Sequence, residues 1–323
     1  MSSYFLGVDT SNYTTSLCLV KDGRIAAEAR RLLPVSEGQR GLRQSDAVFL
    51  HTKALPELLT ELSDTCHVPR TEIAAVGVST RPRDAEGSYM PCFLAGVSFA
   101  SAFAGALDIP LYTFSHQCGH IAAAVCSAGK TELFEKEFLS FHVSGGTTEL
   151  LHVTPLKTGL ICTAIGGTLD LNAGQAIDRT GVALGLAFPC GAQMDKLAQS
   201  SDKRYAPKVA VNGTECSLSG LENQTKKMLA DGERPEDICR YAFSYVGNTL
   251  QRMTENARVA YPRLPVLYAG GVMCNSRIRE QLSQNTDVWF ADARYSCDNA
   301  YGTAMLAAYR HAGDYPANER ELS

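Results

Sequence analysis

Two histidines with helical spacing are the first residues in this chain whose types suit chemistry. His116 and His120 stand four residues apart, where the sequence up to Val125 predicts a helix. Imidazoles at positions i and i+4 project from one face of a helix, so both can bind one metal ion. The same spacing also arises by chance, and the pair alone therefore leaves a metal site as one of two interpretations.

Asp298 is the candidate for a third metal ligand. It directly precedes the last predicted helix, residues 299–311. Two histidines and one carboxylate would leave coordination positions open to substrate oxygens, as in a Lewis-acid site rather than a closed structural site. The alternative role for Asp298 is to cap the N-terminus of that helix.

Two further segments have the residue types of a nucleoside site. Asp170, Gly174 and Asp178 lie in a run of glycines and carboxylates, which suit close approach of a nucleotide and binding of ribose hydroxyls. Gly270 and Gly271 end a predicted buried strand before a helix capped at Asn275, and they would form a flat platform for adenine. An ordinary strand-to-helix turn is the alternative interpretation of this second segment.

A repeated hairpin would position these groups. Residues 5–20 align with residues 138–153 without a gap, with identical residues at seven positions. The second copy predicts a hairpin whose tip has little side-chain bulk, so its backbone N–H groups and hydroxyls could bind phosphate. The predicted phosphate-binding residues are Ser11, Ser144, Gly145, Gly146, Thr147 and Thr148. Chance similarity between two apolar hairpins is the alternative.

The repeat predicts an α/β protein with two related lobes around a nucleotide-binding cleft. We expect an N-terminal lobe over residues 1–112 and a C-terminal lobe with the metal and nucleotide sites over residues 113–298. A closing helix at about residues 299–323 would pack back on the first lobe. No low-complexity linker separates the two lobes.

The composition is that of an ordinary globular protein, with 45% hydrophobic and 20% charged residues in 323. The net charge of −4 gives no overall signal of nucleic-acid binding. Eleven cysteines occur without any C-x-x-C pair, a pattern typical of reduced thiols. Without a signal-like N-terminus or a membrane-length apolar stretch, the sequence predicts a cytoplasmic location and no membrane partner.

Taken together, the motifs resemble the TsaD family of tRNA N6-adenosine threonylcarbamoyltransferases, in the actin-like ATPase (ASKHA) superfamily. The resemblance covers nearly all of residues 4–309 and implies an acyltransferase with one Fe or Zn ion and an ATP- or AMP-type nucleotide. It assigns the metal to His116, His120 and Asp298. It implies nucleoside binding by Asp170, Gly174, Asp178, Gly191 and Asp195. Its expected partners are threonylcarbamoyl-AMP, tRNA and other proteins of a tRNA-modification complex.

Several polar residues depart from the family pattern. The acids that usually follow the first hairpin's Ser11 are missing. The other departures are Thr147 for His, Leu171 for Asp, Gln175 for Glu, Glu222 for Lys, and Tyr301-Gly302 where D-N-A-A is usual. The predicted function is therefore a metal-dependent threonylcarbamoyl or carbamoyl transferase acting through a nucleotide-activated intermediate, with no catalytic residue assigned. The alternatives are a non-catalytic nucleotide-binding scaffold and a carbamoyltransferase with an acceptor other than tRNA. A peptidase is disfavoured, since H-x-x-x-H lacks the glutamate of H-E-x-x-H.

Overall fold

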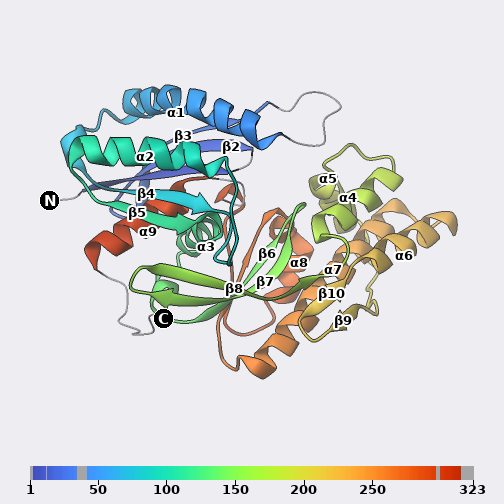
Figure 1. Cartoon of the computed structure of the whole chain (residues 1–323). Helices are drawn as coiled ribbons and strands as arrows, with labels where there is room; N and C mark the ends of the chain where they lie inside the picture. The colour runs from blue at the N-terminus through green and yellow to red at the C-terminus, as the bar shows by residue number, and fades with distance from the viewer. Residues whose placement is uncertain (1–2, 12, 35–41, 296–298, 314–323) are drawn as a thin grey trace. The chain divides into compact units, whose positions relative to one another are not determined.

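The computed structural model describes residues 3–11, 13–34, 42–295 and 299–313 (Figure 1). The chain forms two compact units. The first holds the described residues of Met1–Lys136, Thr154–Cys162 and Cys297–Ser323, and the second holds those of Glu137–Val153 and Thr163–Ser296. The lobe boundary predicted after residue 112 stays a prediction. The two units are defined by contacts in the folded chain, and such contacts do not show which segment folds as an independent lobe.

A five-stranded mixed sheet is the centre of the first unit, in the order β3-β2-β1-β4-β5. The strands are β1 (Tyr4–Ser11), β2 (Thr14–Lys21), β3 (Arg24–Leu32), β4 (Ile73–Arg81) and β5 (Leu111–Ser115). β1, β2 and β3 pair antiparallel, whereas β4 and β5 extend the sheet in parallel. The hairpin predicted over residues 5–20 is confirmed, since Phe5 pairs with Val20 and Ser11 with Thr14.

Helices cover both faces of this sheet (Figure 1). α1 (Gln44–Cys66) and α2 (Phe93–Leu107) lie on one face, and α3 (His116–Ser127) and α9 (Tyr301–Ala312) lie on the other. α1 buries Leu55, Leu58 and Leu62, which recur at helical spacing, against the sheet. The remaining helical turns of this unit are the 3-10 segments η1 (Arg70–Glu72) and η2 (Thr131–Glu135).

A seven-stranded sheet carries the second unit, in the order β12-β11-β6-β7-β8-β10-β9. Its strands are β6 (Phe138–Val143), β7 (Thr148–Leu156), β8 (Gly159–Thr168), β9 (Ala210–Asn212), β10 (Glu215–Ser217), β11 (Val266–Ala269) and β12 (Val288–Phe290). β7 and β8 contribute residues to both units. The predicted second hairpin is confirmed, since β6 and β7 pair antiparallel from Phe138 and Val153 to Val143 and Thr148.

The helices of the second unit pack around α7, whose buried face includes Phe243 and Leu250. They are α4 (Ala173–Ala183), α5 (Gly191–Gln199), α6 (Ser219–Ala230), α7 (Pro235–Ala260) and α8 (Ser276–Leu282), with the 3-10 segments η3 (Gly271–Cys274) and η4 (Ala293–Tyr295). In the sheet, the rings of Phe141 and Tyr268 stack at 5.0 Å between centroids. Among the described residues, no helix combines the length and the apolar character that crossing a bilayer requires.

Candidate functional site

The tip of the second hairpin is closed by Ser144. The Ser144 hydroxyl accepts hydrogen bonds from the N–H groups of Gly146 at 3.3 Å and Thr147 at 3.1 Å. The start of α4 packs on this tip, because the N–H of Gly174 donates to the Ser144 carbonyl at 3.1 Å. A Cβ at Gly174 would lie 2.7 Å from the backbone of Gly145, so only glycine fits there. The structure therefore brings two predicted site segments into direct contact.

Thr148 fixes the other side of the same junction. The N–H of Ala173, at the first turn of α4, donates to the Thr148 hydroxyl at 2.9 Å. The hydroxyls of Ser144 and Thr148 therefore accept their hydrogen bonds from protein backbone. Their predicted role in phosphate binding stays a prediction.

A cavity of about 510 Å³ lies beside this junction within the second unit. Its volume is within the range usual for small-molecule sites. The walls include these predicted site residues: Gly145, Gly174, Asp178, Gly191, Asp195, Gly271 and Asn275. Asp170 and Gly270 are not part of the walls. The sequence motifs at residues 145, 174–195 and 271–275 thus converge on one pocket.

Asn275 contributes a buried polar group to this pocket. Its side-chain oxygen caps α8 by accepting hydrogen bonds from the N–H groups of Arg277 at 3.1 Å and Ile278 at 3.0 Å. Its Nδ2 atom is buried and has no hydrogen-bond partner in the described part of the chain. A buried donor without a partner costs free energy, which a ligand with an acceptor would recover.

Two carboxylates of the pocket also brace its walls. Asp178 Oδ1 accepts a hydrogen bond from the N–H of Cys190 at 2.7 Å, which ties α4 to the start of α5. Asp195 accepts from the N–H and the hydroxyl of Ser276, at 3.2 and 2.9 Å, which ties α5 to α8. Their second role, binding a nucleoside, stays a prediction.

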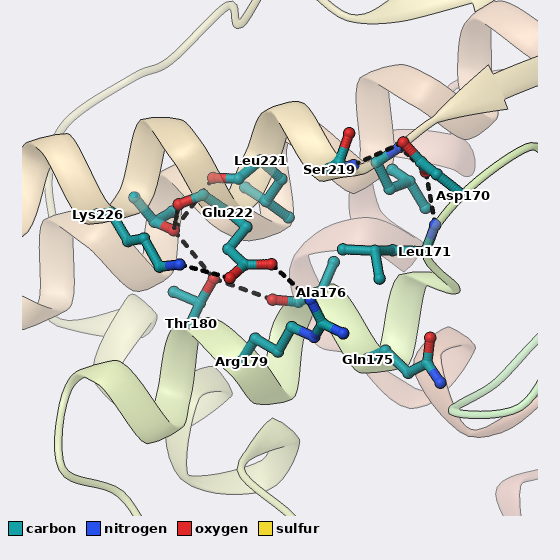
Figure 2. Close-up of polar contacts among 12 residues, drawn as sticks. Asp170, Leu171, Gln175, Ala176, Arg179, Thr180, Ser219, Leu221, Glu222 and Lys226 are labelled. Carbon is teal, nitrogen blue, oxygen red and sulfur yellow. Dashed lines mark hydrogen bonds and ion pairs between the residues drawn. The ribbon is translucent and has the colours of Figure 1, made fainter.

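Asp170 stands apart from the pocket and holds the start of α6. Its Oδ1 atom accepts hydrogen bonds from the N–H groups of Leu171 at 2.6 Å and Leu218 at 2.7 Å, and its Oδ2 atom accepts from Ser219 at 3.2 Å. Burial raises the pKa of Asp170, but the hydrogen bonds from Ser219, Leu218 and Leu171 outweigh burial and lower the pKa to about 2. Figure 2 shows these bonds converging on the carboxylate. In the structure, Asp170 therefore holds the start of α6 in place.

The predicted histidine pair lies on α3 in the first unit. The Nε2 atoms of His116 and His120 are 2.9 Å apart, so both nitrogens face one point. The Nδ1 atom of His116 lies 2.9 Å from Oδ1 of Asp9, a residue that is 1% exposed. A carboxylate on the far nitrogen is the arrangement that orients a metal-binding imidazole. The pair fits two ligands of a metal ion, and the third predicted ligand, Asp298, lies outside the described residues.

Ser11, the phosphate ligand predicted in the first hairpin, is 4% exposed. Its N–H donates to Oδ2 of Asp9 at 3.3 Å, while its hydroxyl has no hydrogen-bond partner in the part of the chain that the structure describes. Asp9 was not among the predicted site residues. The signal that could have found it is its place near the end of the first strand of the repeat, where a carboxylate can reach α3.

Glu222 and Gln175, two departures from the family pattern, have structural partners, and Figure 2 shows those of Glu222. Glu222 on α6 accepts hydrogen bonds from Arg179 of α4 at 2.8 Å and from Lys226 at 2.6 Å. The bonds to Lys226 and Arg179 lower the pKa of Glu222. The side-chain oxygen of Gln175 accepts from the N–H of Asn172 at 3.3 Å and completes the capping box of α4. Both substitutions are therefore integrated into this chain's own packing.

Comparison with known sequences agrees with the motifs. A family model described as tRNA N6-adenosine threonylcarbamoyltransferase matches residues 37–305. A tRNA N6-adenosine threonylcarbamoyltransferase of Streptococcus equi subsp. zooepidemicus is 29% identical, over 98% of this chain and 96% of its own length. One of Pyrobaculum calidifontis is 27% identical, over 95% of this chain and 87% of its own length.

Solved structures share the fold at low sequence identity. HypF of T. kodakarensis has a TM-score of 0.56 at 12% identity, over 97% of this chain and 48% of its own. The ROK hexokinase of Thermus thermophilus has a TM-score of 0.53 at 16% identity, over 97% of this chain and 100% of its own. The predicted actin-like ATPase fold is confirmed by these similarities.

Proposed function

Because this chain belongs to the tRNA N6-adenosine threonylcarbamoyltransferase family, whose members are transferases, we propose that it transfers a threonylcarbamoyl group from an adenylate to an adenosine of tRNA. In this reaction the N6 amine attacks the carbamoyl carbon, the C–N bond forms, and AMP leaves with the electrons of the broken C–O bond. The amine loses a proton in the same sequence. The protein has to bind the adenylate, orient the carbamoyl group and exclude water.

The pocket of the second unit is the proposed adenylate site. The observation that carries this proposal is that Gly145, Gly271, Asp178, Asp195 and Asn275 line one cavity, beside which the buried Nδ2 atom of Asn275 has no partner in the described residues. The faces of Gly145 and Gly271, where a Cβ would meet nothing within 4 Å, let a flat base approach the backbone. Asp178 and Asp195 lie in the same walls, where carboxylates can accept hydrogen bonds from ribose hydroxyls.

His116, His120 and Asp298 are the residues that would hold the metal ion. When bound, an Fe or Zn ion would supply Lewis-acid polarisation of a substrate oxygen. Asp9 has a positioning role, because its hydrogen bond to Nδ1 of His116 directs the Nε2 atom of that ring toward His120. The hairpin tip at Ser144 would place the phosphate of the adenylate beside Gly145, which lines the cavity.

Nucleotide binding tests the pocket directly. We expect Asn275→Asp to weaken AMP binding about tenfold or more, because it keeps the oxygen that caps α8 and removes the Nδ2 donor. Asn275→Ser also keeps an oxygen that can cap α8, and it removes the Nδ2 donor without adding a charge. Isothermal titration calorimetry measures the AMP affinity of both variants. Asn248→Asp is a control for an amide-to-carboxylate change on α7 outside the cavity walls. Unchanged AMP affinity in both Asn275 variants would place the nucleotide elsewhere.

Transfer itself is tested with threonylcarbamoyl-AMP and tRNA, with modified nucleosides detected by mass spectrometry. N6-threonylcarbamoyladenosine formed only in the presence of this chain supports the proposal. Tight AMP binding without any modified nucleoside, even with the partner proteins of a homologous system added, would favour the non-catalytic scaffold. Elemental analysis of wild-type and His116→Ala protein tests the metal assignment, and equal Fe and Zn content in both would refute it.

A further inference from the structure

Three side chains that have no role in the proposed function lie close together, on the face of α3 opposite His116 and His120. Asp84 follows β4, Cys118 lies on α3 and Cys162 lies on β8, and their ligand atoms all fall within 4.8 Å of one another. All three belong to the first unit. Cys118 and Cys162 are buried, at 2% and 4% exposed, and Asp84 is half-buried.

Helix geometry separates this cluster from the histidine pair. At 3.6 residues per turn, Cys118 points about 200° around α3 from His116 and about 160° from His120. The two imidazoles therefore share one face of the helix, and the Cys118 thiol leaves from the opposite face. A cation bound at one group is not bound by the other.

The cluster holds more oxygen and sulfur atoms with lone pairs than thiol protons that could bind them. The Cys118 sulfur lies 2.8 Å from Oδ2 of Asp84, 3.1 Å from the carbonyl oxygen of Leu160 and 3.8 Å from the sulfur of Cys162. Two thiol protons cannot give each of these atoms a good hydrogen bond. A divalent cation in their midst would bind several of them at once.

The spacing of the sulfurs matches the ion that thiolates prefer. In a tetrahedral zinc site with Zn–S bonds of about 2.3 Å, two sulfurs stand about 3.8 Å apart. The Cys118 and Cys162 sulfurs stand at 3.8 Å already. The carboxylate oxygen is closer than the site requires, and it would move outward by less than about 1 Å, which a loop residue after a strand can accommodate.

Arg81 orients the Asp84 carboxylate and offsets part of the negative charge of the three ligands. Its Nη2 atom binds Oδ1 of Asp84 at 2.7 Å, which leaves Oδ2 directed at Cys118. Such support of a ligating carboxylate is characteristic of metal sites. Two thiolates and a carboxylate carry three negative charges, which a divalent cation and the Arg81 guanidinium together neutralise.

We propose that Asp84, Cys118 and Cys162 form a Zn²⁺ site distinct from the histidine site. Three protein ligands leave a fourth coordination position. Asp84 and Cys118 line a cavity of about 460 Å³, so this position is reached from the cavity. The inference does not depend on the proposed transfer reaction, since every group in it lies outside the adenylate pocket.

Cobalt titration tests the site, because sulfur bound to Co²⁺ gives charge-transfer absorption in the near ultraviolet and histidine or carboxylate does not. The full chain is stripped with a chelator under reducing conditions and titrated with Co²⁺, and then with Zn²⁺. We expect sulfur-to-cobalt absorption with the amplitude of one site per chain, saturating at one equivalent in His116→Ala protein and abolished by Zn²⁺. Reduced, folded wild-type protein without this absorption would overturn the proposal.

Variants assign the ligands. Cys118→Ser and Cys162→Ser should each abolish or strongly reduce the absorption, whereas His116→Ala should retain it. Cys126→Ser is the matched control, because Cys126 lies on the same helix outside the cluster, and it should also retain the absorption. Arg81→Met should weaken Zn²⁺ binding by about 10- to 100-fold while keeping the spectrum.

Two results would contradict the assignment even with a cobalt signal. Retention of the signal in both Cys118→Ser and Cys162→Ser would place the sulfur ligand elsewhere. Peptide mapping that finds a Cys118–Cys162 disulfide in protein purified with Zn²⁺ would show that the two sulfurs pair with each other. If a serine variant does not fold, the wild-type titration and the peptide map still decide between these outcomes.

Discussion

At the residue scale, Asp170 shows how a motif residue can serve the scaffold. Its position after two glycines suggested a ribose ligand, yet its oxygens accept backbone hydrogen bonds at the start of α6. Only the fold reveals this, because Leu218 and Ser219 are almost fifty residues away in sequence. A carboxylate stabilised in its ionised form links folding to pH.

The pKa of Asp170, lowered from 3.8 to about 2, predicts an acid-sensitive contribution to stability. The contribution is fully present above about pH 4 and is lost as the pH falls toward 2, because the unfolded state takes up the proton first. We expect Asp170→Asn to be less stable than wild type at pH 7 and to lose less stability between pH 4 and 2. Urea unfolding at several pH values measures this, with the exposed Asp64→Asn as control. Parallel pH profiles for wild type and Asp170→Asn would contradict it.

At the element scale, α3 and α9 approach each other through glycine. A Cβ on Gly302 would overlap the carbonyl oxygen of Gly119, which belongs to helix backbone and cannot move aside. We expect Gly302→Ala to destabilise the protein by about 1–3 kcal/mol through overpacking. Gly105→Ala on α2 is the matched control, since its Cβ would meet nothing within 4 Å and alanine favours a helix by up to about 1 kcal/mol. Equal midpoints of thermal unfolding for Gly302→Ala and Gly105→Ala would show that α3 and α9 can move apart without lowering the free energy of unfolding.

The elements themselves were largely predictable from sequence, while their contacts were not. Apolar patterns predicted both hairpins, because burial imposes the strand period locally. The cluster of Asp84, Cys118 and Cys162 joins a loop, a helix and a strand, and no spacing in the sequence indicates that they meet. The ion pair between Glu222 and Arg179 likewise depends on how α6 packs on α4. Local pattern thus specifies the elements, and tertiary packing decides which side chains share a site.

At the scale of the whole molecule, charge limits how this chain can hold tRNA. The net charge is −4, and Arg31, one of the four arginines at positions 30, 31, 40 and 43, is paired with Glu57. A negative net charge gives the phosphates of RNA no overall attraction to this chain. The chain by itself should therefore gain little affinity from the RNA backbone, and the acceptor would have to be presented by partner proteins or recognised through the adenosine.

This argument predicts a shallow salt dependence. Fluorescence anisotropy with labelled tRNA should show the Kd of the isolated chain rising by only about tenfold between 50 and 200 mM salt, as one or two phosphate contacts would give. A protein that neutralises six to ten phosphates loses about 10³–10⁵ in affinity over the same range. A steep slope that becomes shallow in Arg30→Ala/Arg43→Ala would identify a local basic surface and remove the need for a partner. A slope that is shallow alone but steep when partner proteins are added would assign RNA binding to the complex, leaving this chain to bind the adenylate and direct the transfer.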